Sequence, residues 1–251
     1  MKTILYCFSA TGNSLTTANL LAKGFENCEV IPVASLMGED TVTADADAVG
    51  YVFPVYYGDM PYPVRETVMK TTYRENAYIF TVMTYRGHAG KAAERLNLLL
   101  HTRDAKLSYA DGVHMPGNSY INEPEVDAAY LAEQKNAVQA LIAPIKNRTV
   151  QEFSAEELPD TPVSKPDNFR GIAADERCMG CGTCAQVCPM ENITVENGKA
   201  VIGENCATCL ACFHWCPVEA IWMSKQENIA RRKKYRHPNV SFWDIVGQKD
   251  G

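Results

Sequence analysis

Cys178-Met-Gly-Cys181-Gly-Thr-Cys184-Ala-Gln-Val-Cys188-Pro189 recurs further along the chain as Cys206-Ala-Thr-Cys209-Leu-Ala-Cys212-Phe-His-Trp-Cys216-Pro217. Both copies have the spacing C-x2-C-x2-C-x3-C-P, and together they use eight of the chain's 10 cysteines. The repeat continues beyond the cysteines, because the residues after the fourth cysteine align position by position, Pro-Met-Glu-Asn-Ile-Thr against Pro-Val-Glu-Ala-Ile-Trp. The sequence therefore contains a duplicated unit with pseudo-two-fold symmetry.

Two other uses of paired cysteines compete with a metal cluster. A disulfide framework needs an oxidising compartment, and no apolar signal stretch opens the chain. A structural zinc site closes with four ligands, whereas each copy adds a third C-x2 step and a C-x3-C-P ending. The spacing favours neither disulfides nor zinc.

The duplicated unit resembles the bacterial ferredoxins that carry two 4Fe–4S clusters, over about residues 171–224. The resemblance implies a small α+β domain in which the fourth cysteine of each copy ligates the cluster of the other copy. It implies a first cysteine set and a second cysteine set, each of four ligands. The first set is Cys178, Cys181, Cys184 and Cys216, and the second set is Cys206, Cys209, Cys212 and Cys188.

The two copies differ before their last cysteine. The first copy has Ala185-Gln-Val, whereas the second has Phe213-His-Trp. Two interpretations stay open: the bulk is ordinary helix packing, or it shields one cluster from solvent and separates the two reduction potentials.

A second motif lies near the N-terminus. Thr3–Phe8 is a short apolar run that favours a strand, and it ends in Ser9-Ala10-Thr11-Gly12-Asn13-Ser14. Leu15, Ala18, Leu21 and Ala22 then recur at helical spacing. A polar turn between a buried strand and a helix N-terminus suits a phosphate, although the segment is neither a Walker loop nor G-x-G-x-x-G.

This turn resembles the phosphate loop of the flavodoxins, [Ser/Thr]-x-Thr-Gly-x-[Ser/Thr], at every defined position. The resemblance implies that Ser9, Thr11 and Ser14 donate hydroxyls to the phosphate of FMN, while Gly12 lets the backbone approach and Asn13 completes the loop. The loop contains no Lys or Arg, and flavodoxins likewise hold the phosphate with neutral donors.

The rest of the N-terminal half alternates strands and helices. Four further strands are predicted, at Val30–Val33, Ala48–Phe53, Ala77–Met83 and Lys106–His114, and a helix is predicted to begin at Pro124. Five such alternations predict an α/β fold with a doubly wound, five-stranded parallel sheet. The arrangement is similar to flavodoxin, which implies the strand order 2-1-3-4-5 and a flavin at the carboxyl edge.

The loops after the third and fourth strands are expected to flank the flavin ring, as in flavodoxins. The resemblance carries over to Val55, Tyr56, Tyr57 and Gly58 and to Thr84, Tyr85, Arg86, Gly87 and Gly90. Tyr85 is expected to stack on the ring, and either Tyr56 or Tyr57 is expected to cover its other face. His88 is interpreted either as a proton donor or as a polar loop residue, and Arg86 either as a charge near the ring or as a solvated one.

Composition sets the remaining boundaries. We expect a flavodoxin-like domain over residues 1–146, a linker over 147–170, the ferredoxin domain over 171–224 and a basic tail over 225–251. The net charge of −6 gives no reason to expect nucleic acid as a partner. No apolar run approaches the ~18 residues that span a bilayer. A cytoplasmic, reducing and anaerobic setting is expected for so many thiolates.

The tail is expected to fold back across the ferredoxin domain, to dock on the flavin domain, or to remain a solvated charge run. Its apolar segment Val240–Val246 is expected to pack on the body of the protein. Cys7, outside the repeats, is expected to be a small buried residue.

The combined order resembles the flavodoxin–ferredoxin fusion proteins of anaerobes. It implies electron transfer between two 4Fe–4S clusters and FMN, with redox proteins (a ferredoxin or a flavin oxidoreductase) as partners. An FMN-dependent reductase of a small organic acceptor, a quinone or an enone, is the alternative, and a redox sensor is a third hypothesis. Contact between the domains within one chain or across a homodimer stays open.

Overall fold

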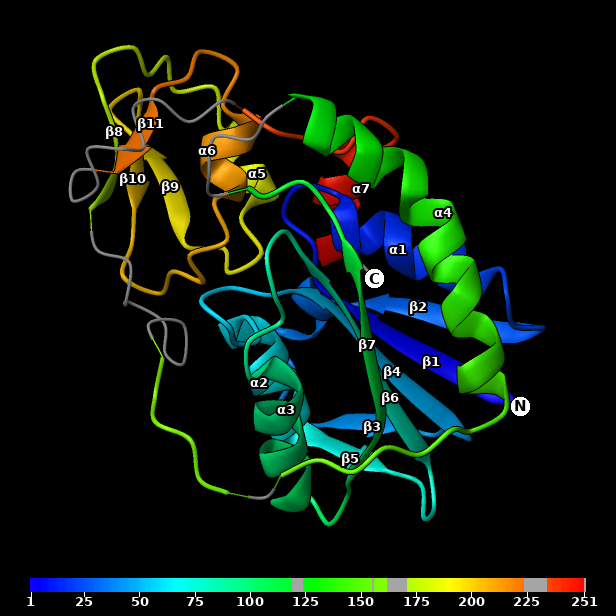
Figure 1. The fold of residues 1–251 in the computed structure, drawn as a ribbon. Coiled ribbons are helices and arrows are strands. Elements are labelled where there is room, and N and C mark those ends of the chain that lie inside the picture. Colours follow the sequence, from blue (N-terminus) through cyan, green and yellow to red (C-terminus); the bar gives the residue numbers. More distant parts are fainter. Residues whose placement is uncertain (119–123, 155, 162–170, 224–233, 251) are drawn as a thin grey trace.

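A computed structural model describes residues 1–118, 124–154, 156–161, 171–223 and 234–250. It has a large α/β body and a smaller module beside the carboxyl edge of the body's sheet (Figure 1). The body contains β1 Lys2–Cys7, α1 Asn13–Ala22, β2 Asn27–Pro32, β3 Val42–Ala44, β4 Ala48–Pro54, α2 Tyr62–Lys70, β5 Thr71–Tyr73, β6 Tyr78–Tyr85, α3 Ala92–His101, β7 Leu107–His114 and α4 Pro124–Lys146, with a 3-10 turn at Val33–Leu36.

The main sheet has five strands in the order β2-β1-β4-β6-β7, and every pairing is parallel. This is the predicted doubly wound order 2-1-3-4-5, which confirms the flavodoxin-like fold class. The second strand begins at Asn27 rather than Val30, and the fourth ends at Tyr85 rather than Met83. Thr84 and Tyr85 therefore lie on the strand end and not in the loop. A small parallel pair, β3 with β5, was not predicted.

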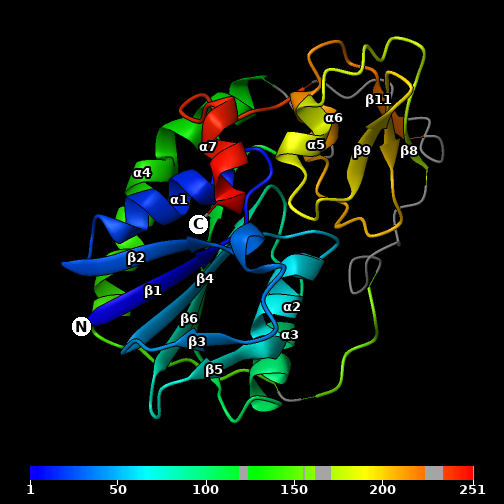
Figure 2. The same ribbon diagram turned by 180° about the vertical axis from the view of Figure 1, so that it is seen from behind.

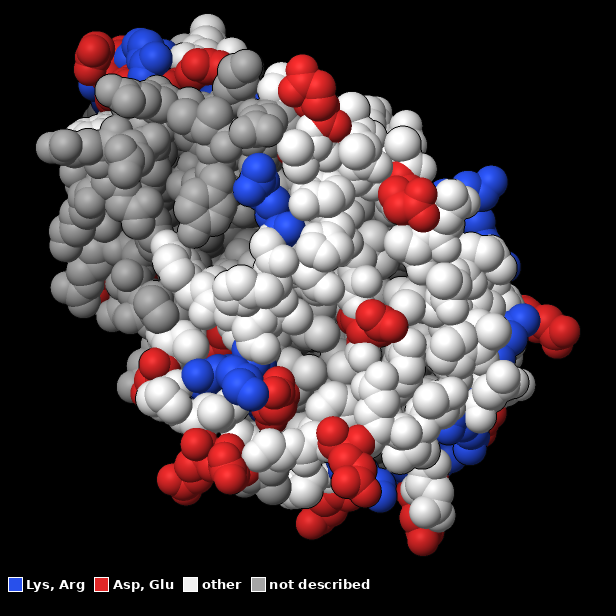
Figure 3. Space-filling model, viewed as in Figure 1, with Lys and Arg blue, Asp and Glu red and all other residues white. Residues whose placement is uncertain are grey.

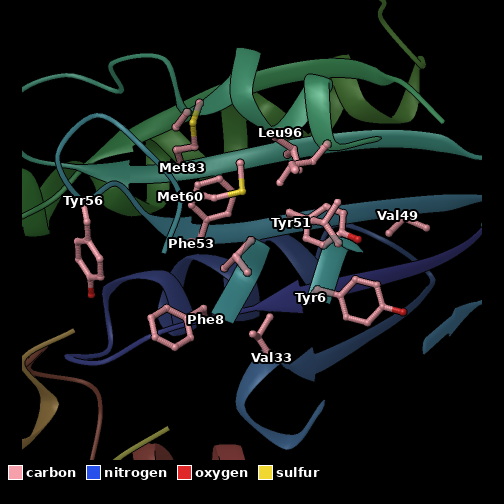
Figure 4. Close-up of a cluster of buried hydrophobic side chains, with 14 of the residues drawn as sticks. Tyr6, Phe8, Val33, Val49, Tyr51, Phe53, Tyr56, Met60, Met83 and Leu96 are labelled. Atoms are coloured by element: carbon pink, nitrogen blue, oxygen red, sulfur yellow. The ribbon is translucent and has the colours of Figure 1, made fainter. Parts of the chain in front are cut away.

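Helices cover both faces of the sheet (Figures 1 and 2). Leu5 and Cys7 point to the face of α1 and α4, whereas Ile4 and Tyr6 point to the face of α2 and α3. The alternation follows from the two-residue period of a strand. Figure 4 shows the cluster on the second face. Cys7 is 1% exposed, which confirms that it is a buried residue, and burial raises the pKa of its thiol.

The module is built from two similar halves. The strand β8 Ile172–Ala174 pairs antiparallel with β11 Ile221–Met223, and β9 Ile193–Glu196 pairs antiparallel with β10 Lys199–Ile202. One short helix follows each cysteine loop, α5 Thr183–Val187 and α6 Ala211–Trp215. The module is thus small and α+β, as expected.

The described parts of the predicted linker, residues 147–154 and 156–161, lie against the body. The backbone N–H of Gln151 donates to the carbonyl of Ser108 at 2.8 Å, and Phe153 packs on the core. The Thr161 hydroxyl donates to a carboxylate oxygen of Asp59 at 2.7 Å. Residues 162–170 of the predicted linker lie outside the described residues.

The C-terminal segment, residues 234–250, is called the strap below. It contains α7 Phe242–Val246 and a 3-10 turn at Gly247–Lys249, and Ser241 and Asp244 form a capping box at the start of α7. Ile245 is 3% exposed, and Gln248 Nε2 donates to the carbonyl of Ser9 at 3.0 Å. These contacts confirm that the apolar end of the chain packs on the body.

The basic residues Lys225 and Arg231–Lys233 lie outside the described residues. On the face shown in Figure 3, acidic and basic side chains are interspersed over the described part of the body. None of the described helices is long and apolar enough to cross a membrane.

Candidate functional site

A cavity of about 640 Å³ lies at the carboxyl edge of the sheet. Its volume falls in the range of about 300–1,000 Å³ that is usual for cofactor pockets. The loops after β1, β4, β6 and β7 form most of its wall, and the module supplies the rest. It is lined by Ser9, Ala10, Thr11, Asn13, Ser14, Pro54, Val55, Tyr56, Tyr57, Gly58, Thr84, Tyr85, Arg86, Gly87, His88, Met115, Pro116, Gly117, Asn118, Thr208 and Leu210.

The polar turn at the start of α1 forms one end of this cavity. Ser9 accepts a hydrogen bond from the backbone N–H of Gly12 at 3.1 Å, so its hydroxyl holds the turn together. The Ser14 hydroxyl lies 2.8 Å from the Thr84 hydroxyl and is buried. The turn thus places neutral donors at a helix N-terminus, which is a favourable position for an anion.

Asn13 is held from both ends of its amide. Its Nδ2 donates to the carbonyl of Pro116 at 2.9 Å, and its Oδ1 accepts from the hydroxyl of Tyr235 at 2.6 Å. Gln134 Nε2 donates to the backbone carbonyl of Asn13 at 3.4 Å. The Asn13 side chain therefore ties the turn to a neighbouring loop and to the strap.

Gly12 is the one residue of the turn, between Ser9 and Ser14, that does not line the cavity. It has a φ of +101°, and a Cβ built on it would lie 2.7 Å from Val240 Cγ2 and 2.9 Å from His237 Cβ. The backbone N–H of His237 also donates to the carbonyl of Thr11 at 2.7 Å. The strap thus fills the space behind the turn.

The two loops expected around the flavin ring both reach the cavity. Tyr56 is 8% exposed and Tyr57 is 54% exposed, so the two neighbouring tyrosines face a buried and an open part of the wall. Tyr56 belongs to the core cluster drawn in Figure 4 and lies at its edge. Burial raises the pKa of the Tyr56 hydroxyl. Tyr85 is half-buried and meets the ring of His114 edge-on at 4.8 Å.

Three other predicted residues differ in their positions. The Arg86 Nε is buried without a hydrogen-bond partner among the described residues, whereas His88 is exposed at the rim. Gly90 does not line the cavity, because it packs against the backbone of Gly58, where a Cβ on Gly90 would lie 2.3 Å from the Gly58 Cα. Gly90 therefore joins the two loops.

The structure gathers the cysteines into the two predicted groups. The four cysteines of the first set line one small cavity, and the four of the second set line another. No three possible ligands among the described residues lie close enough to hold a single metal ion. Four soft thiols around a cavity fit an iron–sulfur cluster better than one zinc ion.

The two sets differ in the exposure of one cysteine. Cys181 of the first set is exposed, and its neighbour Met179, 65% exposed, lines the same cavity. Cys209 and Cys212 of the second set are buried, and burial raises the pKa of both thiols. Each set thus has two buried cysteines, and the first set reaches the surface at Cys181.

Helix α6 attaches the second half of the module to the body. Trp215 Nε1 donates to the carbonyl of Ala10 at 2.9 Å, and both are buried. His214 Nδ1 accepts from the backbone N–H of Tyr235, so its Nε2 carries the proton and donates to the carbonyl of Asn118 at 2.7 Å. Two of the three bulky residues that distinguish the second copy therefore anchor the module on the body.

The strap crosses this junction. Lys234 Nζ lies 3.4 Å from the centre of the Phe213 ring and donates to the Phe213 carbonyl at 2.5 Å. Arg236 Nε donates to the carbonyl of His214 at 2.9 Å and lies over the Trp215 ring. The described part of the tail thus both crosses the module and docks on the body.

Substituting Trp215 with phenylalanine tests the junction. The change keeps an aromatic ring but leaves the Ala10 carbonyl buried without its donor, which costs about 1–3 kcal/mol. We expect the free energy of unfolding to fall by that amount in anaerobic denaturant titrations. Trp222→Phe, at a 43% exposed site of the module, is the control. Equal stability of the two variants would contradict the contact.

Residues 171–233 match the family of 4Fe–4S dicluster domains. Ferredoxin-2 of Desulfomicrobium norvegicum is 50% identical over 30 residues, which are 12% of this chain and 51% of that protein. The NADH-quinone oxidoreductase subunit I of Sodalis glossinidius is 34% identical over 64 residues, 22% of this chain and 36% of that protein. A CoB-CoM heterodisulfide reductase component of Methanosarcina acetivorans is 28% identical over 152 residues, 60% of this chain and 19% of that protein. The chain spans about half or less of each relative.

Solved flavoproteins resemble the body at low identity. A flavoprotein from Bacteroides uniformis covers 57% of this chain and 97% of its own, with 12% identity and a TM-score of 0.41. The rubredoxin oxygen:oxidoreductase of Desulfovibrio gigas covers 59% of this chain and 36% of its own, with 14% identity and a TM-score of 0.37. By its own strand order and its matched repeat, the chain joins a flavodoxin-like domain to a 4Fe–4S dicluster domain.

Several cavity residues were not predicted. The loop Met115–Asn118 follows the fifth strand, and its place at the same carboxyl edge was an available signal. Thr208 and Leu210 come from the module and reach the cavity only because the two parts dock.

Proposed function

We propose that this chain is an electron-transfer protein that holds two 4Fe–4S clusters in its cysteine sets and FMN in the cavity of the body. A bound cluster supplies single electrons, and bound FMN supplies a group that accepts one or two. One observation carries the proposal: Leu210, which follows the cluster ligand Cys209, lines both the cavity of the second set and the cavity of the body.

Different residues of the body would hold the phosphate and the ring of FMN. Ser9, Thr11 and Ser14 would meet the phosphate at the start of α1, where the peptide dipoles favour an anion. Tyr85 and Tyr56 would flank the ring from the ends of β6 and β4. Because the turn contains no cationic side chain, it would recognise the phosphate by hydrogen bonding and shape and not by charge.

The exposure of Cys181 supports a direction along the molecule. A partner protein would meet the first set, where Cys181 and Met179 are exposed. The second set would exchange electrons with FMN across the wall formed by Thr208 and Leu210. The clusters thus connect the surface at Cys181 to the cavity of the body within one chain.

Anaerobic reduction of the reconstituted protein tests the proposal. When the clusters are photoreduced or given electrons by a reduced ferredoxin, we expect the absorbance of bound flavin to bleach with the cluster signals. A protein that binds FMN fully and keeps it oxidised beside reduced clusters would contradict it. A protein that binds iron but no FMN would also do so.

A reductase of a small organic acceptor is the second candidate, because Tyr57 and His88 leave the rim of the cavity open to solvent. Turnover assays with reduced ferredoxin, with and without quinones and enones, separate the two. Acceptor-dependent turnover in a steady state supports the reductase. Its absence, with flavin still reduced by the clusters, supports the carrier.

A further inference from the structure

The two cysteine loops of the module differ at two equivalent positions with the same unusual backbone. In the first copy, Gly180 and Gly182 have φ values of +67° and +76°. In the second copy, Thr208 and Leu210 take these places and have φ values of +55° and +63°. Only glycine adopts this left-handed region without a steric penalty.

The first copy obeys that steric rule and the second breaks it. A Cβ on Gly180 would also lie 2.7 Å from the carbonyl oxygen of Gly198, so this position requires glycine. At Thr208 the chain keeps a β-branched side chain in the left-handed region, where such residues are genuine outliers. Strain of this kind persists where the surroundings fix it, and it concentrates at functional sites.

The residues at the two left-handed positions of the second copy lie at the same cavity. Both Thr208 and Leu210 line the cavity of the body, although their chain segment belongs to the module. Thr208 is 7% exposed, and its Oγ1 is buried without a hydrogen-bond partner among the described residues. A buried, unpaired hydroxyl is costly unless a ligand or water completes it.

The backbone N–H of the same residue contacts the second cysteine set. The N–H of Thr208 donates to Cys206 Sγ at 3.4 Å, and Cys206 belongs to the second cysteine set. One residue therefore contacts a proposed cluster ligand through its amide and also belongs to the lining of the cavity.

We propose that Thr208 is a flavin-binding residue that the dicluster module contributes, with its Oγ1 hydrogen-bonded to FMN in the cavity of the body. This inference rests on the proposed function, since it needs FMN as the occupant. It explains why a threonine stands where the other copy has glycine. It also makes the FMN site complete only when the module is docked.

Isosteric substitution tests the contact. Thr208→Val keeps the shape and removes the hydroxyl, whereas Thr208→Ser keeps the hydroxyl. We expect the Kd for FMN, measured by flavin fluorescence on protein with full iron and sulfide content, to rise about five- to tenfold in Thr208→Val. We expect Thr208→Ser to stay within about twofold of the unaltered chain. Thr194→Val, at an exposed site on β9, is the matched control and should leave the Kd unchanged.

A second variant separates a flavin contact of Thr208 from a role of Thr208 in packing alone. Thr208→Gly removes the hydroxyl and the strain together, so we expect a higher melting temperature with weaker FMN binding. A residue needed only for packing would lose stability in this variant. The reduction potential of the flavin, read by redox titration, should shift in Thr208→Val and not in Thr194→Val.

Two results would overturn the inference, and they are distinguishable. If Thr208→Val binds FMN as the unaltered chain does, with the same potential, the hydroxyl makes no flavin contact and the proposed function stands. If the unaltered chain with full clusters binds no FMN, the proposed function fails and the inference with it.

Discussion

Flavin reduction by the clusters is expected to slow by more than about 100-fold when Cys209 is replaced with alanine, because removal of a ligand exceeds the 10–100-fold effect of losing an outer partner of a metal site. Cys209 belongs to the second cysteine set, which is the set that shares Leu210 with the cavity of the body. Without that cluster, no electron carrier remains beside the cavity. Anaerobic photoreduction followed by flavin absorbance measures the rate.

Cys181→Ala is the matched variant in the first set. Since Cys181 lines only the outer, surface-reaching cavity, we expect the second cluster to form and to reduce FMN at an undiminished rate under photoreduction. Reduction by a partner ferredoxin should fail in both variants. Iron content and FMN affinity confirm that each variant is folded. Rapid flavin photoreduction in Cys209→Ala, or a loss confined to Cys181→Ala, would reverse the proposed order of the sets.

Gly12→Ala is expected to have the largest effect on stability and on FMN binding together. The substitution forces a side chain into a φ of +101°, at a cost of about 1–3 kcal/mol. Its Cβ would also overlap Val240 and His237, and overpacking adds about 1–3 kcal/mol. We expect a loss of about 2–6 kcal/mol in the free energy of unfolding, together with displacement of the strap.

Gly38→Ala provides the control, because a Cβ on Gly38 has no heavy atom within 4 Å. It should leave stability and FMN affinity almost unchanged. Limited proteolysis adds a local readout, since a displaced strap should be cleaved first in Gly12→Ala. If both alanine variants have equal melting temperatures, the strap does not pack behind the turn as described.

Local sequence patterns were enough for the elements that depend on neighbours along the chain. The turn from Ser9 to Ser14 and the two cysteine loops were predictable, because each needs particular residues at short, fixed spacings. The doubly wound parallel sheet followed from the alternation of strands and helices, and the strand order followed from the resemblance to flavodoxin. Strand ends were less predictable, since Thr84 and Tyr85 are polar or aromatic yet extend β6.

Features that depend on the docking of distant segments could not be predicted from local sequence patterns. Asn13 was expected at the phosphate, but its amide is engaged by Pro116 and Tyr235, and Tyr235 follows it by more than 200 residues. Thr208 was not predicted, although it replaces a glycine of the other copy at a left-handed position. Comparison of the two copies, residue by residue, would have marked it.

The packing of the strap behind Gly12 has a consequence for the order of events during synthesis. Val240 leaves the ribosome 228 residues after Gly12 (240 − 12), which takes roughly 10–45 s at about 5–20 residues per second. The nascent N-terminal half therefore spends that interval with an unsupported turn. It reaches its finished form only when the whole dicluster segment has already been translated.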